Sequence, residues 1–122
     1  MGNSWTDTQP IYRQLRERVA GLIMSGAFTE GEAIPSVRKV SAEEQINHLT
    51  VAKAYQELVD EGVLEMRRGR GMFVVEGARD RLRKMECDKF KKDEVPALVA
   101  RLSHLNISVE ELVELIKQRQ GG

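Results

Sequence analysis

The sequence predicts a mainly α-helical protein with one small β-hairpin. Apolar residues recur at three- and four-residue spacing within 10–25, 36–44 and 48–61, which is the helical period. Two short β-prone runs, 63–66 and 72–75, flank a glycine-containing turn, as in a hairpin. The remaining stretch, 78–122, again has a helical pattern. A length of 122 residues fits one small domain with an appendage.

The composition excludes several classes of protein. The net charge is +0 and 41% of the residues are hydrophobic, which argues against a disordered or a strongly basic chain. A single cysteine excludes a disulfide framework and a cysteine-rich zinc module. No apolar run is long enough to span a bilayer, and the first residues do not resemble a signal peptide. We therefore expect a cytoplasmic protein with no membrane partner.

The charge is unevenly distributed. Residues 66–92 hold ten basic and four acidic side chains, whereas 1–65 and 93–122 are both net acidic. A basic middle between acidic flanks is a candidate anion-binding surface. A solvated, charged helix face is the alternative interpretation.

The first three predicted helices have recognisable ends. Thr8 is the expected N-cap of the first helix, with Pro10 in its first turn and Gly26 at its C-terminal end. Ser36 is the expected cap of the second. Asn47 is expected to cap the third by accepting a hydrogen bond from the N–H of Thr50. Gly62 ends the third helix, and Ile34 is expected to enter the core from the loop before the second.

The stretch after the hairpin predicts further helix. Pro96 marks either a kink or a fresh helix start. A turn is expected at 106–107. Ser108 and Glu111 then form a capping-box pattern at the start of a last helix.

Three helices followed by a hairpin is the element order of a winged helix-turn-helix domain. In such domains the N-terminal residues of the third helix meet base edges in the major groove. Polar side chains there can pair with bases, and Leu49 can contact a thymine methyl. Arginines among glycines at the hairpin tip, the wing, suit a phosphate or a minor groove. The candidate DNA contacts are therefore Asn47, His48, Leu49, Thr50, Lys53, Arg67, Arg68, Gly69, Arg70 and Gly71.

Several spaced motifs resemble the GntR family of bacterial transcription regulators. They are Pro10-Ile11-Tyr12-x-Gln14-Leu15, Ile34-Pro35-Ser36-Val37-Arg38, Thr50-Val51, Ala54-Tyr55-x-x-Leu58, Glu61-Gly62 and Arg68-Gly69-Arg70-Gly71-x-Phe73-Val74. Together they span about residues 9–76. The resemblance implies a sequence-specific DNA-binding regulator, a repressor in many relatives, and adds Ser36 and Arg38 to the candidate DNA contacts. An ion pair of Arg38 with Glu43 or Glu44 is the alternative role for that side chain.

The short stretch after the wing resembles the YtrA-type subfamily, whose helical tails serve dimerisation. The resemblance implies a DNA-binding domain at 9–77, a dimerisation tail at 78–120, and a homodimer on a two-fold symmetric operator. Members of that subfamily often control ABC transporter operons, and an unidentified small-molecule effector is a further possible partner. Residues 78–103 would span about 39 Å as a helix, so a partner copy is expected to cover the apolar residues of the tail. These are Leu82, Met85, Phe90, Leu98, Val99, Leu102, Leu112, Val113 and Ile116.

Several alternatives remain at this point. Many relatives have glycine where this chain has Gln45, so the turn is either strained by about 1 kcal/mol or takes another form. His48 can be an idle surface residue, and Leu49 can pack back on the turn. The sequence shows no catalytic set, no metal cluster and no cofactor motif, so we expect that the protein is not an enzyme. Cys87 is expected to be a free thiol. The competing function is a winged-helix protein-interaction module that does not bind DNA.

Overall fold

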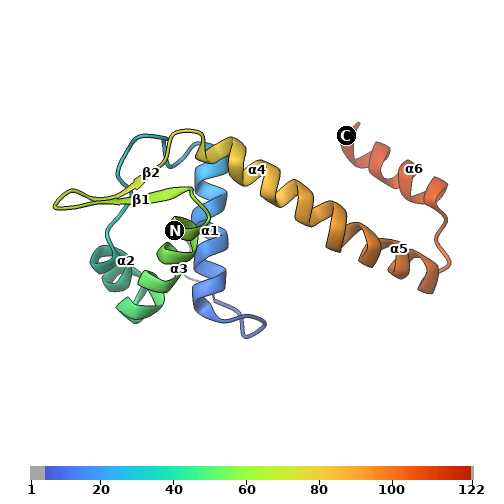
Figure 1. Ribbon diagram of the computed structural model, residues 1–122. Helices are drawn as coiled ribbons and strands as arrows, with labels where there is room; N and C mark the ends of the chain where they lie inside the picture. The colour runs from blue at the N-terminus through green and yellow to red at the C-terminus, as the bar shows by residue number, and fades with distance from the viewer. Residues whose placement is uncertain (1–4, 122) are drawn as a thin grey trace. The chain divides into compact units, whose positions relative to one another are not determined.

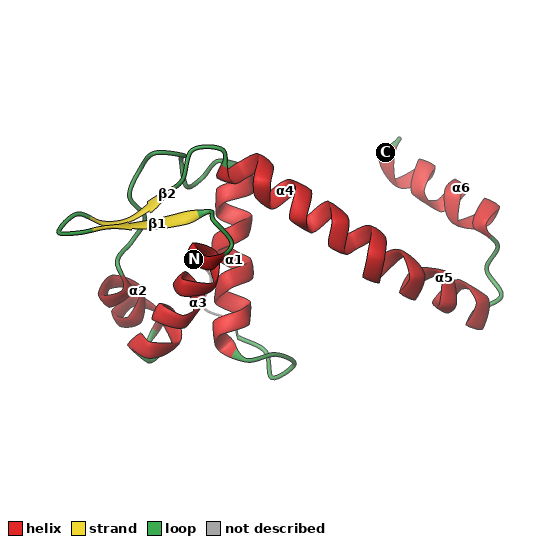
Figure 2. Ribbon diagram, viewed as in Figure 1, coloured by secondary structure: helices red, strands yellow, loops and turns green. Residues whose placement is uncertain are grey.

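The structure is a computed structural model that describes residues 5–121. The chain forms two compact units, one ending at Lys84 and the other beginning at Met85. Helices dominate and a two-stranded sheet is present, which confirms the predicted fold class (Figures 1 and 2). The elements are α1 (Ile11–Ser25), α2 (Val37–Glu44), α3 (His48–Asp60), β1 (Leu64–Arg67), β2 (Gly71–Val74), α4 (Ala78–Lys89), the π-helical segment η1 (Phe90–Glu94), α5 (Val95–His104) and α6 (Val109–Gln120).

The start of α1 differs from the prediction. Pro10 itself is the N-cap, and no side chain caps the helix. The predicted cap, Thr8, is wrong, because Thr8 lies two residues before Pro10 and its hydroxyl instead contacts the hydroxyl of Thr6 at 2.7 Å. The amide of Gln14 holds this segment by donating to the carbonyls of Thr6 and Gln9 at 2.8 and 2.7 Å.

The turn between α2 and α3 keeps the left-handed form. Gln45 has φ 54° and ψ 45°, so this chain accepts the strain that glycine would avoid. Ser36 caps α2 as predicted, accepting from the N–H of Lys39 at 3.1 Å. Asn47 caps α3, but its carbonyl oxygen Oδ1 accepts from the N–H of Leu49 at 2.8 Å. The predicted donor, Thr50, is wrong for that side chain, since its N–H donates to the backbone carbonyl of Asn47.

The core of the first unit lies between the three helices and the hairpin. Ile34 is buried in it, as predicted from the sequence. Tyr55 lies in the same core, and its hydroxyl donates to the carbonyl of Pro35 at 2.7 Å. Burial raises the pKa of Tyr55 to about 12. This bond fixes the loop that leads into α2, so the core sets the position of Ser36 and Arg38.

The two strands of the hairpin are each shifted by one residue from the prediction. β1 begins one residue later than predicted, and β2 begins one residue earlier. The strands pair antiparallel from Leu64 opposite Val74 to Arg67 opposite Gly71. The loop before α2 covers the other edge of β2, because Gly31 N–H donates to the Val74 carbonyl and Ile34 N–H to the Met72 carbonyl. Figure 1 shows the tip of the hairpin extending beyond the helices of this unit.

Helical residues continue without a break from 78 to 104. Pro96 lies in the first turn of α5, directly after η1, and the backbone of Glu94 and Val95 is helical there, so Pro96 begins α5 within a continuing helix. A proline lacks the N–H that the helix would use, and the wider π-turn accommodates that loss. Asn106 has φ 55° in the turn before α6. Ser108 caps α6 by accepting from the N–H of Glu111 at 3.1 Å, which confirms that half of the capping box.

The predicted tail residues divide into buried, half-buried and exposed groups. Leu82 is fully buried in the core of the first unit. Its own chain already covers it, so the expectation that a partner copy covers Leu82 is corrected. Leu102 is also buried within the chain, whereas Met85 and Leu112 are half-buried. The other predicted residues are exposed: Phe90, Leu98, Val99, Val113 and Ile116. Within residues 5–121, helices that are both long and apolar enough to cross a membrane are absent.

Candidate nucleic-acid interface

The first turn of α3 presents the predicted base-reading residues to solvent. Asn47, His48 and Leu49 are exposed, and Thr50 is half-buried. Leu49 is 66% exposed, so it does not pack back on the turn. The carbonyl of Asn47 is occupied by the cap, which leaves its amide NH₂ as a hydrogen-bond donor. Packing within the core of the protein therefore does not explain the side chains of Asn47, His48 and Leu49.

Arg38 lies on the solvent side of α2, close to this turn. With Val37, Ser41, Ala42 and His48, Arg38 lines an open hollow of about 640 Å³. The alternative ion pair of Arg38 with Glu43 or Glu44 is absent from the described residues, and Glu43 instead lies 3.9 Å from Lys39 Nζ. Arg38 is thus exposed and available to an external anion.

Lys53 is held by an aromatic ring. Its Nζ lies 3.9 Å from the centroid of the Tyr12 ring, and the guanidinium of Arg13 lies 5.9 Å from the same centroid. Such cation–π contacts are favourable and leave the charge accessible. Lys53 is one turn further along α3 than the exposed residues at its start, which is a position suited to a phosphate rather than to a base.

The three arginines of the wing are not equivalent. Arg67 is partly buried, donates to Glu65 at 2.9 Å, and lies 4.2 Å from the centroid of the Phe73 ring. Arg68 and Arg70 are exposed at the tip. Gly69 has φ 75°, a conformation that side chains rarely adopt, so glycine is needed there for the turn. The guanidinium of Arg70 also lies near the Phe73 ring, 5.6 Å from its centroid, so Arg68 and Arg70 differ from Arg67 by their greater exposure and by the ion pair that Arg67 forms with Glu65.

The wing and α2 border a common groove. Ser36, Arg38, Arg70 and Gly71 lie along it, so candidates from separate segments meet there. The exposed start of α3 adjoins it, because Val37 and Arg38 line both hollows. Two adjoining hollows are therefore lined by candidates from separate segments: Ser36, Arg38, His48, Arg70 and Gly71.

The sequence did not reveal which side chains fix the start of α4. The carboxylate of Glu30 accepts from the N–H groups of Gly77 and Arg79, both at 3.0 Å. These two backbone bonds lower the pKa of Glu30. Arg79 donates to the carbonyl of Met24 at 2.7 Å, and Arg81 donates to that of Glu61 at 2.7 Å. The charged run at 79–81 gave no signal for these contacts, since its partners are backbone groups distant in sequence.

Within residues 5–121, no group of three His, Cys, Asp or Glu side chains is placed to hold a metal ion. Cys87 is an exposed free thiol, as expected. The candidate site is therefore the exposed start of α3 together with the neighbouring groove, which has arginines at its edge.

The comparison with protein families identifies this arrangement. Residues 11–74 match the family described as bacterial regulatory proteins, gntR family. The chain belongs to the GntR family. It is accordingly a DNA-binding transcriptional regulator and not an enzyme. Over 109 residues it is 33% identical to the HTH-type transcriptional repressor YtrA of Bacillus subtilis, which covers 89% of this chain and 83% of YtrA. This places the GntR-family chain with the YtrA-type members.

Two solved structures extend the comparison. A GntR family transcriptional regulator from Listeria monocytogenes has a TM-score of 0.79 at 26% identity, covering 93% of this chain and 98% of that one. The DNA-binding domain of AraR, in complex with operator ORR3, has a TM-score of 0.54 at 26% identity. It covers 62% of this chain and 92% of its own. That operator-bound domain therefore shares its fold with about three fifths of this chain.

Proposed function

We propose that this GntR-family chain is a cytoplasmic repressor that binds a two-fold symmetric operator as a homodimer. The observation that carries the proposal is the pair of adjoining hollows lined by His48 at the start of α3, by Arg38 of α2 and by Arg70 of the wing. On this proposal Asn47, His48, Leu49 and Thr50 read base edges from the major groove. Arg68 and Arg70 enter a minor groove or contact phosphates, as Arg38, Lys53 and the Ser36 hydroxyl do. Arg67 contributes chiefly by shaping the wing.

The homodimer is supported by the exposed apolar side chains of the second unit. Eight of the eleven large apolar side chains that are exposed in the described chain lie there. They are Phe90, Leu98, Val99, Leu105, Val109, Val113, Leu115 and Ile116. These side chains are 40–61% exposed, so covering each of them contributes a part of the about 1.5–3 kcal/mol that full burial gives, and the eight contributions together favour a dimer. A symmetric pair is the commonest form of homo-oligomer and would present two recognition helices to a symmetric site.

The relative YtrA is a transcriptional repressor by name, which supports repression as the outcome of binding. The resemblance to YtrA-type regulators extends the proposal to an ABC transporter operon as the controlled unit. Such regulators are often encoded beside the genes that they control, so the promoter of the chain's own operon is the first DNA to examine.

Footprinting of the full chain on that promoter tests the proposal. We expect protection of two half-sites whose centres lie about one DNA turn apart or more, and lower transcription in its presence. Binding should weaken steeply with salt, because counterions are released from each contacted phosphate. Absence of both protection and salt-dependent retention on heparin would instead favour a winged-helix module that binds proteins.

A further inference from the structure

The groove between α2 and the wing has an apolar floor and a basic edge. Its volume is about 280 Å³, close to the lower end of small-molecule sites. The floor is formed by the buried residues Ile34, Tyr55 and Met72, with Val37 and Met66 beside them. The hydroxyl of Tyr55 already donates a hydrogen bond to the Pro35 carbonyl, so that donor needs no acceptor from a molecule bound in the groove.

The edge of the same groove is positively charged. Arg38 and Arg70 line it, together with the hydroxyl of Ser36, and no acidic residue does. Ser36 Oγ accepts from Lys39 N–H and keeps its own proton for donation. Arg38 has no ion-pair partner within residues 5–121. Guanidinium groups form their strongest hydrogen bonds with carboxylates and phosphates.

We propose that this groove binds a small amphipathic organic anion, a carboxylate with an aromatic or branched apolar body. The anionic head would lie between Arg38, Arg70 and Ser36, and the body would cover the floor. A DNA phosphodiester also satisfies the two arginines, but the DNA backbone has no aromatic or branched apolar body to cover the floor. An organic anion matches both parts of the site.

Binding of such an anion opposes binding of the operator. This step rests on the proposed function, in which Arg38 and Arg70 contact DNA. An anion that occupies both side chains removes those contacts, and by linkage the operator displaces the anion equally. The winged domain would then carry its own effector site, and the second unit would be left to hold the dimer together.

Methionine methyl NMR of the full chain tests the site without any DNA. The probe is 4-phenylbutyrate, and the control is 4-phenylbutyramide, which has the same body without the charge. Met66 and Met72 line the groove, whereas Met24 and Met85 lie outside it and serve as internal controls. We expect saturable shifts at Met66 and Met72 alone, with affinity for the amide about tenfold lower. Equal affinities, shifts at Met24 and Met85 as well, or no shift at millimolar probe would overturn the proposal.

A matched pair of variants isolates the basic edge. Arg70→Gln should weaken binding of 4-phenylbutyrate about tenfold, and Lys53→Gln, which removes one positive charge outside the groove, should not. An equal effect of both variants would show general charge attraction and overturn the assignment. In a separate experiment, 4-phenylbutyrate should release a fluorescent promoter fragment from the wild-type chain. Methyl shifts without release of the promoter fragment would overturn the competition between anion and operator and leave the anion site in place. If the fragment does not bind the wild-type chain at all, that result contradicts the proposed function and not the anion site.

Discussion

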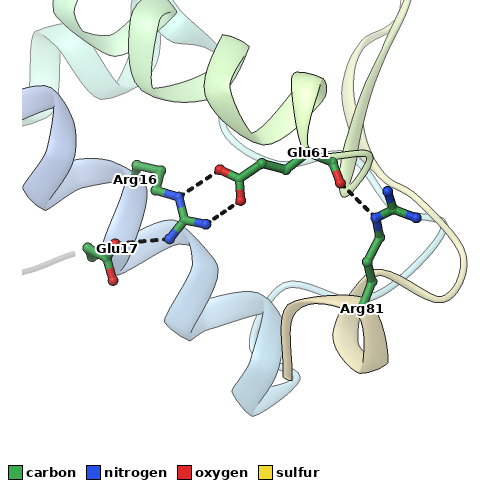
Figure 3. Close-up of polar contacts among 4 residues, drawn as sticks. All are labelled: Arg16, Glu17, Glu61 and Arg81. Carbon is green, nitrogen blue, oxygen red and sulfur yellow. Dashed lines mark hydrogen bonds and ion pairs between the residues drawn. The ribbon is translucent and has the colours of Figure 1, made fainter. Parts of the chain in front are cut away.

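Arg16 of α1 forms a two-pronged ion pair with Glu61, the residue that ends α3 (Figure 3). Arg16 Nε donates to the Glu61 carboxylate at 3.0 Å, and a second bond joins Arg16 Nη2 to the other carboxylate oxygen. Arg16 is 7% exposed and also pairs with Glu17. The backbone carbonyl of Glu61 accepts from Arg81 of α4. One residue thus connects the end of the recognition helix to both the first and the fourth helix.

Glu61→Gln should destabilise the first unit. The substitution keeps the shape but leaves a buried guanidinium without its main carboxylate, which costs about 1–3 kcal/mol for a partly buried pair. Urea unfolding measures the change in the free energy of unfolding. Glu43→Gln is the control, since the Lys39–Glu43 pair is exposed and long at 3.9 Å and should change stability by less than about 0.5 kcal/mol. Equal effects of the two variants would contradict a structural role for Glu61.

Arg68→Ala and Arg70→Ala should weaken binding to all DNA sequences. Each removes one exposed cation from the wing, so the slope of log affinity against log salt should fall by about 1 per lost phosphate contact. Fluorescence anisotropy at several salt concentrations measures it. Arg67→Ala is the comparison, and we expect a smaller change in salt slope because Arg67 is already bonded to Glu65. An unchanged slope in the Arg68 and Arg70 double variant would place the DNA contacts elsewhere.

His48→Ala and Leu49→Ala should alter sequence preference rather than general affinity. Both side chains are exposed at the start of α3, and a lost base contact costs about 1–3 kcal/mol at one operator position. A binding selection on randomised operators gives the preference at each position. Ala52→Ser, a small change at an exposed position further along the same helix, is the control. Identical profiles for wild type and both variants would show that specificity arises outside this turn.

Acidification should weaken the attachment of α4. The two backbone N–H bonds lower the pKa of Glu30 below its ordinary value of 4.5, so the folded state holds the ionised carboxylate more tightly than the unfolded state does. The contribution is fully present above that ordinary value and is lost as the pH falls through the lowered one. Glu30→Gln should therefore flatten the dependence of stability on pH in that range. Glu32→Gln, a change at an exposed neighbour, is the control, and parallel curves for wild type and Glu30→Gln would contradict the assignment.

Sequence patterns predicted the elements well because helix periods and caps are local. The three helices, the hairpin and the caps at Ser36 and Ser108 all follow from residues within a few positions of one another. The contacts of Glu30, Arg79 and Arg81 could not be predicted, since each joins a side chain to a backbone group at least twenty residues away. Leu82 shows the same limit, because its helical stripe gave no sign of whether its own core or another chain would bury it. Gln45 shows that a turn can keep its left-handed form without the glycine that usually signals it.

Glutamate substitutions on the second unit should dissociate the proposed dimer. Val113 and Ile116 are 40% and 46% exposed in the single chain, so a charge at either position is tolerated in a monomer and costly in an apolar interface. Sedimentation of the full chain at micromolar concentration should give a dimer for wild type and a monomer for the Val113→Glu, Ile116→Glu double variant. Gln118→Glu adds one negative charge to an exposed position of α6 and should remain dimeric.

The core of the first unit provides the complementary measurement. This core contains Leu82, and the first unit ends at Lys84. The double variant should therefore keep the unfolding transition of the first unit, although its mass in sedimentation falls from that of a dimer to that of a monomer. DNA affinity should then fall sharply, because one recognition helix alone reads only half of a symmetric site. A wild-type monomer, or a double variant that remains dimeric, would show that the exposed apolar residues of α5 and α6 serve another contact. In that case the two half-sites would have to be bound by independent copies.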